Sequence, residues 1–253
     1  MGIRVFLRKR VTFLNHSNKL KQEHIYRQLK LDRDKALHRI NSVLENRFGK
    51  KYNENFGMWS EHLLLLAAIS QQETSKDIFS ILEIGTFRAE TTLILRDLFP
   101  QSKITTIDLP DSVLKQSSIY SYEFDDIDKA VERNRNLNIS NATFYEMNSL
   151  NLFRLTEKHD LVWMDGDHKK PTVIIDLLNS LNSINSSGVI LCDDVITGFI
   201  FNRNTSNELA KYLQFLERNK IIEYSLIPKR IGTYNQLFRR KYVALIKLTP
   251  AGF

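Results

Sequence analysis

Carboxylate side chains gather in two short segments of the second half of the chain, where their spacing could create a metal site. Asp165 lies in WMDGDHKKP, and the adjacent Asp193 and Asp194 lie in VILCDDV, each behind an apolar run. Three such carboxylates brought together would repel one another unless a cation compensated them. A hard divalent cation accepts oxygen ligands and keeps positions for water or substrate. Asp165, Asp193 and Asp194 are therefore predicted ligands of Mg²⁺ or another divalent cation.

A candidate base follows Asp165 by three residues. Histidine as a residue type titrates near about pH 6.5, which suits proton abstraction at neutral pH. A metal ion beside it would lower the pKa of a bound hydroxyl and fix its position. We predict that His168 and Asp165 are catalytic; Lys169 and Lys170 are alternative bases, and a capping role is the structural alternative for His168. Asp167 is expected to be a turn residue, or to support a neighbouring ligand, and not to be a ligand itself.

A second pattern, ILEIGTFRAETT at residues 81–92, predicts a buried strand, a glycine turn and a helix. Glu83 closes the strand and Gly85 opens the turn, where a glycine lets the backbone approach a ligand closely. Asp108 ends the next apolar run, TTIDLP. A carboxylate in that place can accept hydrogen bonds from both hydroxyls of a ribose. Together these features predict an adenosine-containing ligand.

The turn does not suit the pyrophosphate of NAD. A pyrophosphate needs close-set glycines and an open helix N-terminus. Here Phe87, Arg88, Ala89 and Glu90 occupy that position, and the Glu90 carboxylate would repel a phosphate. A cofactor without phosphates fits better, and S-adenosylmethionine is such a molecule. A nicotinamide-dependent oxidoreductase is the weaker alternative.

The segment LEIGTFRAETTL resembles the first motif of class I methyltransferases, in the version found in small-molecule O-methyltransferases of the catechol and caffeoyl-CoA type. That version has a glutamate, one further residue, a glycine, a small residue, an aromatic residue and then a Ser or Thr. The family usually has a second glycine where Ala89 stands, and a small side chain should be tolerated there. The resemblance covers roughly residues 60–250. These motif positions are filled here by Glu83, Gly85, Thr86, Phe87 and Thr91.

The resemblance also implies roles for residues outside this motif. Asp108 would hold the ribose, and Asn148 and Ser149 in MNSLNL would line the adenine. A helix cap or turn role is the alternative for Ser149. Metal-dependent O-methyltransferases carry an Asp after the fourth strand and an Asp-Asn or Asp-Asp pair after the fifth. Macrocin-type sugar methyltransferases likewise have DGD followed by DD.

The implied activity is transfer of a methyl group from S-adenosylmethionine to a hydroxyl of a small molecule, with a divalent metal assisting. A sugar, a natural product or a catechol-like phenol would be the acceptor. The structural alternative for the acids is a set of solvated turn residues, since DG and DD are common in turns.

Alternating strands and helices must position these residues. The strands are expected at 79–84, 103–108, 142–146, 160–165, 188–193, 222–227 and 242–248. Apolar strands separated by helices predict an α/β fold, Rossmann-like and doubly wound, with a mainly parallel seven-stranded sheet and helices on both faces. Because ligands collect at the carboxyl ends of parallel strands, the acids that end these runs should meet at one edge.

Residues 1–60 are predicted to form a basic helical extension, and residues 61–253 the methyltransferase domain. Apolar residues at helical spacing in 18–48 predict one or two helices, and HLLLLAAIS predicts a buried helix around Trp59–Ser70. The extension would cover the active site or form the surface of a homodimer. The segments 109–124 and 195–206 carry aromatic residues and would form lids over a substrate or pack structurally.

The net charge of +7 comes largely from basic clusters near both ends, which permits nucleic acid, anionic lipid or acidic substrates as partners. A nucleic-acid methyltransferase is therefore one alternative function. The fourth strand is not followed by an Asn-Pro-Pro-Tyr-like segment, nor does the chain contain a Pro-Cys nucleophile, and both observations argue against it. A scaffold that keeps the fold without the chemistry is another alternative.

The composition also indicates in which cellular compartment the protein is expected. Cys192 is the only cysteine, so an intramolecular disulfide is excluded. No apolar run approaches the roughly 18–20 residues that a transmembrane helix needs. Charges interrupt the apolar residues of MGIRVFLRKRVTFL too often for a signal peptide. We therefore expect a cytoplasmic protein without a transmembrane segment.

Overall fold

The computed structural model describes residues 3–54, 59–110, 126–198, 208–231 and 239–250. The chain divides into two compact units. Met1–Ser75 and Leu191–Phe253 together form unit 1, and Lys76–Ile190 forms unit 2.

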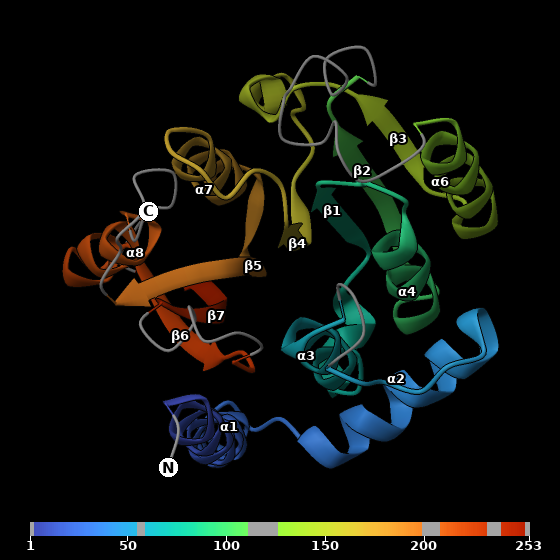
Figure 1. The fold of residues 1–253 in the computed structure, drawn as a ribbon. Helices are drawn as coiled ribbons and strands as arrows, with labels where there is room; N and C mark the ends of the chain where they lie inside the picture. The colour runs from blue at the N-terminus through green and yellow to red at the C-terminus, as the bar shows by residue number, and fades with distance from the viewer. Residues whose placement is uncertain (1–2, 55–58, 111–125, 199–207, 232–238, 251–253) are drawn as a thin grey trace. The chain divides into compact units, whose positions relative to one another are not determined.

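Helices and strands alternate through most of the described chain (Figure 1). The α-helices are α1 (Ile3–Gln28), α2 (Arg33–Phe48), α3 (Glu61–Ser70), α4 (Glu90–Leu98), α6 (Asp126–Ser140), α7 (Thr172–Ser183) and α8 (Glu208–Arg218). Two 3₁₀ helices are η1 (Glu73–Asp77) and η2 (Ser149–Arg154). The strands are β1 (Ser80–Ile84), β2 (Lys103–Asp108), β3 (Thr143–Glu146), β4 (His159–Met164), β5 (Ile184–Gly198), β6 (Ile222–Pro228) and β7 (Arg239–Leu248).

The strands form one seven-stranded sheet in the order β3-β2-β1-β4-β5-β7-β6. β1 pairs in parallel with both β2 and β4, and β2 pairs in parallel with β3. β6 and β7 form an antiparallel pair. The predicted mainly parallel, Rossmann-like α/β fold is confirmed.

Unit 2 has the buried apolar strands that a parallel sheet requires. Ile81 and Leu82 of β1 are fully buried, as are Leu161 and Val162 of β4, because such strands are covered on both faces. Trp163 is also fully buried, as expected for a core residue of the fourth strand. On the helical side, α4 packs against α6, and α7 packs against β4 and η2 (Figure 1).

The fifth strand differs most from its prediction. β5 spans Ile184–Gly198 and not 188–193, so Asp193 and Asp194 lie within the strand and do not follow it. The placement of these acids at the end of the strand was therefore wrong. Asp194 has a φ of 52°, a left-handed conformation that Asp adopts more readily than most residues, so the strand is irregular at this point.

The two segments expected to determine the substrate are only partly described. Residues 195–198 of the second segment belong to β5 and are not a loop. The ranges 111–125 and 199–207 lie outside the described residues, and with them the aromatic side chains Tyr120, Tyr122, Phe124, Phe199 and Phe201.

The N-terminal residues form the predicted helices. The side chain of Asp32 caps α2 by accepting a hydrogen bond from the Lys35 amide at 2.9 Å, and Gly49 ends the helix in a left-handed conformation. α3 is buried all round, as its apolar composition predicted. Within unit 1, α2 packs against α3 and α1 contacts β6. No described helix combines the length and the hydropathy needed to cross a membrane.

Candidate functional site

The glycine turn, residues 84–90 between β1 and α4, packs against the backbone of Asp165. Gly85 has a φ of 98°, and a Cβ atom added there would lie 2.3 Å from the carbonyl oxygen of Asp165. The Gly85 amide donates to the Ile107 carbonyl, and the Asp165 amide donates to the Ile84 carbonyl, both at 2.9 Å. Only a glycine fits here, because any side chain would collide with the backbone at the end of β4.

Ala89 shows why a glycine is usual at its position. Its φ is 56°, in the left-handed region, and its amide donates to the Thr86 carbonyl at 2.7 Å. An L-residue pays about 1–2 kcal/mol for this conformation, whereas glycine adopts it freely. The small alanine side chain is fully buried where α4 begins.

Asp108 lies beside the glycine turn at the end of β2. Its Oδ2 accepts a hydrogen bond from the Phe87 amide at 2.7 Å, and its Oδ1 accepts one from the Leu109 amide at 2.8 Å. A carboxylate offers about four lone-pair positions, so each oxygen retains an acceptor direction. The carboxylate is therefore fixed in orientation and can still accept hydrogen bonds from a diol such as a ribose.

Glu83 and Thr86 lie deeper than the sequence suggested. Glu83 is fully buried, and its Oε2 accepts hydrogen bonds from the hydroxyls of Thr92 at 2.5 Å and Thr106 at 2.7 Å. The Thr86 hydroxyl lies 2.7 Å from that of Thr106. Burial raises the pKa of Glu83 to about 7 despite these hydrogen bonds. Both residues hold the turn from the inside.

The other predicted cofactor residues lie at the edges of the same turn. Phe87 and Thr91 are half-buried. The Phe87 ring is 4.9 Å from the Lys129 ammonium, measured to the ring centroid. Asn148 caps η2, with its Oδ1 accepting from the Leu150 amide at 2.9 Å, and Ser149 is the first residue of that helix. This segment directly follows β3, the neighbour of the strand that carries Asp108.

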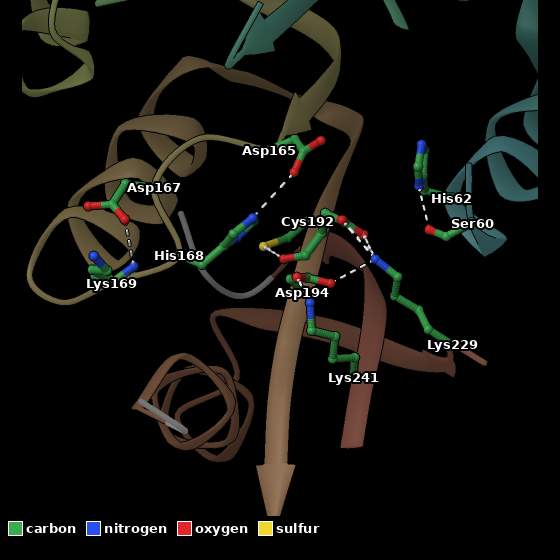
Figure 2. Close-up of polar contacts among 11 residues, drawn as sticks. Ser60, His62, Asp165, Asp167, His168, Lys169, Cys192, Asp194, Lys229 and Lys241 are labelled. Atoms are coloured by element: carbon green, nitrogen blue, oxygen red, sulfur yellow. Dashed lines mark hydrogen bonds and ion pairs between the residues drawn. The ribbon is translucent and has the colours of Figure 1, made fainter. Parts of the chain in front are cut away.

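The two predicted catalytic residues lie together after β4, as Figure 2 shows. His168 Nε2 is 3.5 Å from Asp165 Oδ1, and the side chains of His168 and Asp165 are 36% and 19% exposed. Asp167 Oδ1 accepts a hydrogen bond from the Lys169 amide at 3.1 Å, so Asp167 is a turn residue. Because Asp165 also contacts the glycine turn through its backbone, this pair lies next to the candidate cofactor site.

A buried carboxyl below this loop escaped the sequence analysis. Asp176 of α7 is 1% exposed, and its Oδ2 lies 3.3 Å from the position of a Cβ atom on Gly166. Burial raises its pKa to about 6, against the opposing effect of a hydrogen bond with Ser149. A signal was present in the sequence: Val173, Leu177 and Ser180 mark the inner face of a helix, and Asp176 falls on that face.

Asp193 and Asp194, here called the acid pair, contact two lysines of unit 1 (Figure 2). Lys229 Nζ lies 2.9 Å from both carboxylate oxygens of Asp193 and 2.7 Å from Oδ1 of Asp194. Lys241 Nζ donates to Oδ2 of Asp194. Among the residues that the structure describes, no group of three or more His, Cys, Asp or Glu side chains is arranged to hold a metal ion. Both carboxylates of the acid pair instead contact lysine ammonium groups.

His62 of α3 is a further residue near the acid pair that the sequence did not single out. It is 4% exposed, and its Nδ1 lies 2.7 Å from the Ser60 hydroxyl (Figure 2). Burial lowers the pKa of His62 to about 4, although the charges of Asp193 and Asp194 favour the protonated form. The imidazole is therefore neutral at physiological pH.

Comparisons with known proteins agree with this fold. Residues 82–195, which span the glycine turn, Asp108, Asp165 and the acid pair, match the family model of a methyltransferase domain. The cofactor-bound structure of Rv0187 from MTB has 18% identity and a TM-score of 0.52, with 84% of this chain and 87% of that one covered. The O-methyltransferase TomG from Streptomyces achromogenes, in complex with S-adenosylmethionine, has 16% identity and a TM-score of 0.51 over 89% of this chain and 94% of that one.

Two further matches concern proteins of other kinds. A protein named as an rRNA methylase from Clostridium thermocellum has 13% identity and a TM-score of 0.50, with 77% of this chain and 98% of that one covered. The chaperone protein HtpG of Buchnera aphidicola is 25% identical over 244 residues. These residues are 93% of this chain, which spans about a third (33%) of that protein's length.

Identities this low establish the fold and leave the substrate open. The structural match and the family match agree, because residues 82–195 cover the strands and turns that build the candidate cofactor site. Residues 82–195 thus match a methyltransferase domain, and the chain has a Rossmann-like α/β fold similar to that of the O-methyltransferase TomG.

Proposed function

We propose that this chain transfers a methyl group from S-adenosylmethionine to a hydroxyl of a small molecule. One observation carries the proposal: the glycine turn packs on the backbone of Asp165, whose side chain pairs with His168. A candidate cofactor site and a candidate base therefore share one residue of unit 2. The methyltransferase domain match over residues 82–195 supports the same reaction class.

The residues of the glycine turn fit the proposed cofactor. Gly85 lets the turn pack closely on the backbone of Asp165, and Asp108 keeps acceptor directions for the ribose hydroxyls. Asn148 and Ser149, which follow the neighbouring strand, would line the adenine. When bound, S-adenosylmethionine supplies an electrophilic methyl group on a sulfonium. The turn contains one glycine and no phosphate-binding repeat, which favours this cofactor over NAD.

His168 would take the proton of the acceptor hydroxyl. Because Nε2 faces the Asp165 carboxylate, the neutral imidazole places its proton on Nε2 and its lone pair on Nδ1. Nδ1 is then the atom that accepts the hydroxyl proton, and the Asp165 carboxylate stabilises the resulting imidazolium. General-base catalysis of this kind contributes about 10²–10⁴ in rate.

The proposed acceptors are sugars, hydroxylated natural products and catechol-like phenols. TomG, which has a similar fold, is an O-methyltransferase of tomaymycin synthesis, and this favours a natural product. Metal assistance, which the sequence predicted, is not part of the proposal because the acid pair is bonded to Lys229 and Lys241.

The test is a methyl-transfer assay with acceptors of these three classes, and with RNA, followed by mass spectrometry of the products. His168→Asn should lower kcat by about 100-fold or more with the accepted substrate while binding of S-adenosylhomocysteine is unchanged. His24→Asn, which replaces an exposed histidine of α1, is the matched control and should keep the full rate. Full activity of His168→Asn would refute the base assignment, and methylation of RNA alone would favour the nucleic-acid alternative.

A further inference from the structure

The four carboxylate oxygens of the acid pair all accept hydrogen bonds from lysine ammonium groups. Lys229 bonds both oxygens of Asp193 and Oδ1 of Asp194, and Lys241 bonds Oδ2 of Asp194. Two negative charges thus meet two positive charges. The electrostatic repulsion between adjacent carboxylates, which led us to expect a metal ion, is already compensated.

These groups are also largely removed from water. The side chains of Lys229 and Asp194 are each 12% exposed, and that of Asp193 is 9% exposed. A lysine is rarely so buried unless it is paired with a carboxylate. Burial opposes the charged form of Lys229, but Asp193 and Asp194 outweigh it and the pKa of the lysine is raised. Lys229 therefore stays protonated wherever the acid pair is ionised.

The N-terminal helix holds the segment that carries Lys229. Gln22 Nε2 donates to the Pro228 carbonyl at 2.7 Å, and Asn18 Nδ2 donates to the Lys229 carbonyl at 3.0 Å. Asn15 bonds both the amide and the carbonyl of Ile231, at 2.8 and 3.1 Å.

These three amide side chains share one face of α1, because residues three and four apart are neighbours on a helix. Gln22 and Asn18 are only 3% and 7% exposed. The Lys229 amide in turn donates to the Lys241 carbonyl at 2.9 Å, which ties the backbones of the two lysines together. These hydrogen bonds thus hold the backbone segments from which both lysine side chains extend toward the acid pair.

A divalent cation would meet an ammonium group at every carboxylate oxygen of this arrangement. Mg²⁺ requires oxygen ligands at about 2.0–2.1 Å in octahedral geometry. It would compete with two ammonium groups for these oxygens, and it would separate the largely buried Lys229 from its carboxylate partners. Breaking a buried ion pair in this way is strongly unfavourable.

We propose that Lys229 and Lys241 are the resident counter-cations of Asp193 and Asp194, that this acid pair binds no divalent cation, and that Asn18 and Gln22 of α1 position Lys229. One consequence of this inference is methyl transfer without a metal, and that consequence rests on the proposed function. The N-terminal helix is then a supporting part of the acid-pair site and not a separate appendage.

Titration of the full chain with Mn²⁺, followed by electron paramagnetic resonance, tests the first part. We expect no binding up to about 1 mM, the weak end of biological divalent-cation sites. Binding of one Mn²⁺ that Asp194→Asn removes would overturn the proposal. Calorimetry with S-adenosylhomocysteine on the same samples separates the two ideas, since absence of that binding would refute the proposed function and leave the Mn²⁺ result standing.

Denaturation midpoints of a double-mutant cycle test the ion pair itself. Lys229→Met should lower the midpoint, and adding Asp193→Asn should restore at least half of the loss, because the unpaired charge is removed. Lys247→Met, an exposed lysine of β7, is the matched control and should leave the midpoint unchanged. If Asp193→Asn gives no recovery, Lys229 is not the counter-cation.

The same cycle in a Gln22→Ala background tests the role of α1. If Gln22 positions Lys229, Asp193→Asn should restore at most half as much of the denaturation midpoint as it does in the wild-type background, because Lys229 is no longer held against the acid pair. A recovery equal to that in the wild-type background would show that Gln22 stabilises the fold without positioning Lys229, and would overturn this part of the proposal.

Discussion

Gly85 is the residue on which the candidate cofactor site most depends. It combines a φ of 98° with a backbone contact that leaves no room for a Cβ atom. We predict that Gly85→Ala destabilises the protein by about 2–5 kcal/mol, the sum of left-handed strain and overpacking. Binding of S-adenosylhomocysteine should weaken at least tenfold, because the turn must move away from Asp165. Calorimetry and urea denaturation would measure both effects.

Gly49 offers the matched control for this substitution. It also has a positive φ, 63°, but a Cβ atom there would meet no other atom within 4 Å. Gly49→Ala should therefore cost only the strain of about 1–2 kcal/mol and leave cofactor binding unchanged. Equal effects of the two variants on binding would contradict the role given to Gly85.

The residues that sequence predicts well are those whose partners are close in the chain or fixed by strand order. Gly85 and Asp108 follow from a strand-turn-helix pattern, and Asp165 and His168 are three residues apart. Lys229 could not be found in this way. It belongs to a C-terminal basic cluster that suggests a charged surface, and only the strand order β5-β7-β6 in the sheet brings it to the acid pair.

At the scale of elements, the buried carboxyl of Glu83 joins three pieces of unit 2. It belongs to β1 and accepts hydrogen bonds from Thr92 of α4 and Thr106 of β2. The strand and helix patterns predict each of these elements. They do not predict the connection, because a glutamate at the end of a strand can equally face a ligand, as the sequence analysis supposed.

The raised pKa of Glu83 predicts a pH dependence of stability. Burial raises this pKa from 4.5 to about 7. Between these values the folded state keeps a proton that the unfolded state releases, so the contribution of Glu83 is fully present below about pH 4.5 and is lost as pH rises. Glu83→Gln stays neutral, so its stability relative to the wild type should increase between about pH 5 and about pH 8.

Urea denaturation at both pH values measures this difference, with the exposed Glu223→Gln as control. Glu61, whose pKa burial also raises to about 7, contributes equally to wild type and variant and cancels. A difference between Glu83→Gln and wild type that is constant with pH would show that Glu83 is ionised in the folded protein throughout this range.

β5 shows the limit of prediction at this scale. The apolar run VILC marks the middle of the strand, but hydrogen bonding continues through Asp193 and Asp194 to Gly198. Charged residues normally end a buried strand, because an unpaired buried charge is unfavourable. Here Lys229 and Lys241 compensate both charges, so the strand can continue.

For the whole molecule, the fold was predictable because alternating strands and helices admit few topologies. The placement of the first helices was not. α1, α2 and α3 belong to the same compact unit as β6 and β7, and the hydrogen bonds that hold α1 join residues more than 200 positions apart, as between Gln22 and Pro228. Such contacts leave no periodic signal in the sequence.

We propose that this chain binds S-adenosylmethionine through the glycine turn. The most direct measurement is thermal denaturation with S-adenosylhomocysteine and, in parallel, with NAD. A ligand at about 100 times its Kd adds roughly 2.7 kcal/mol of stability if it binds only the folded state. We predict a rise in Tm with S-adenosylhomocysteine, none with NAD, and no change in either result when a metal chelator is added. A folded protein whose Tm does not respond to saturating S-adenosylhomocysteine would contradict binding of S-adenosylmethionine at the glycine turn.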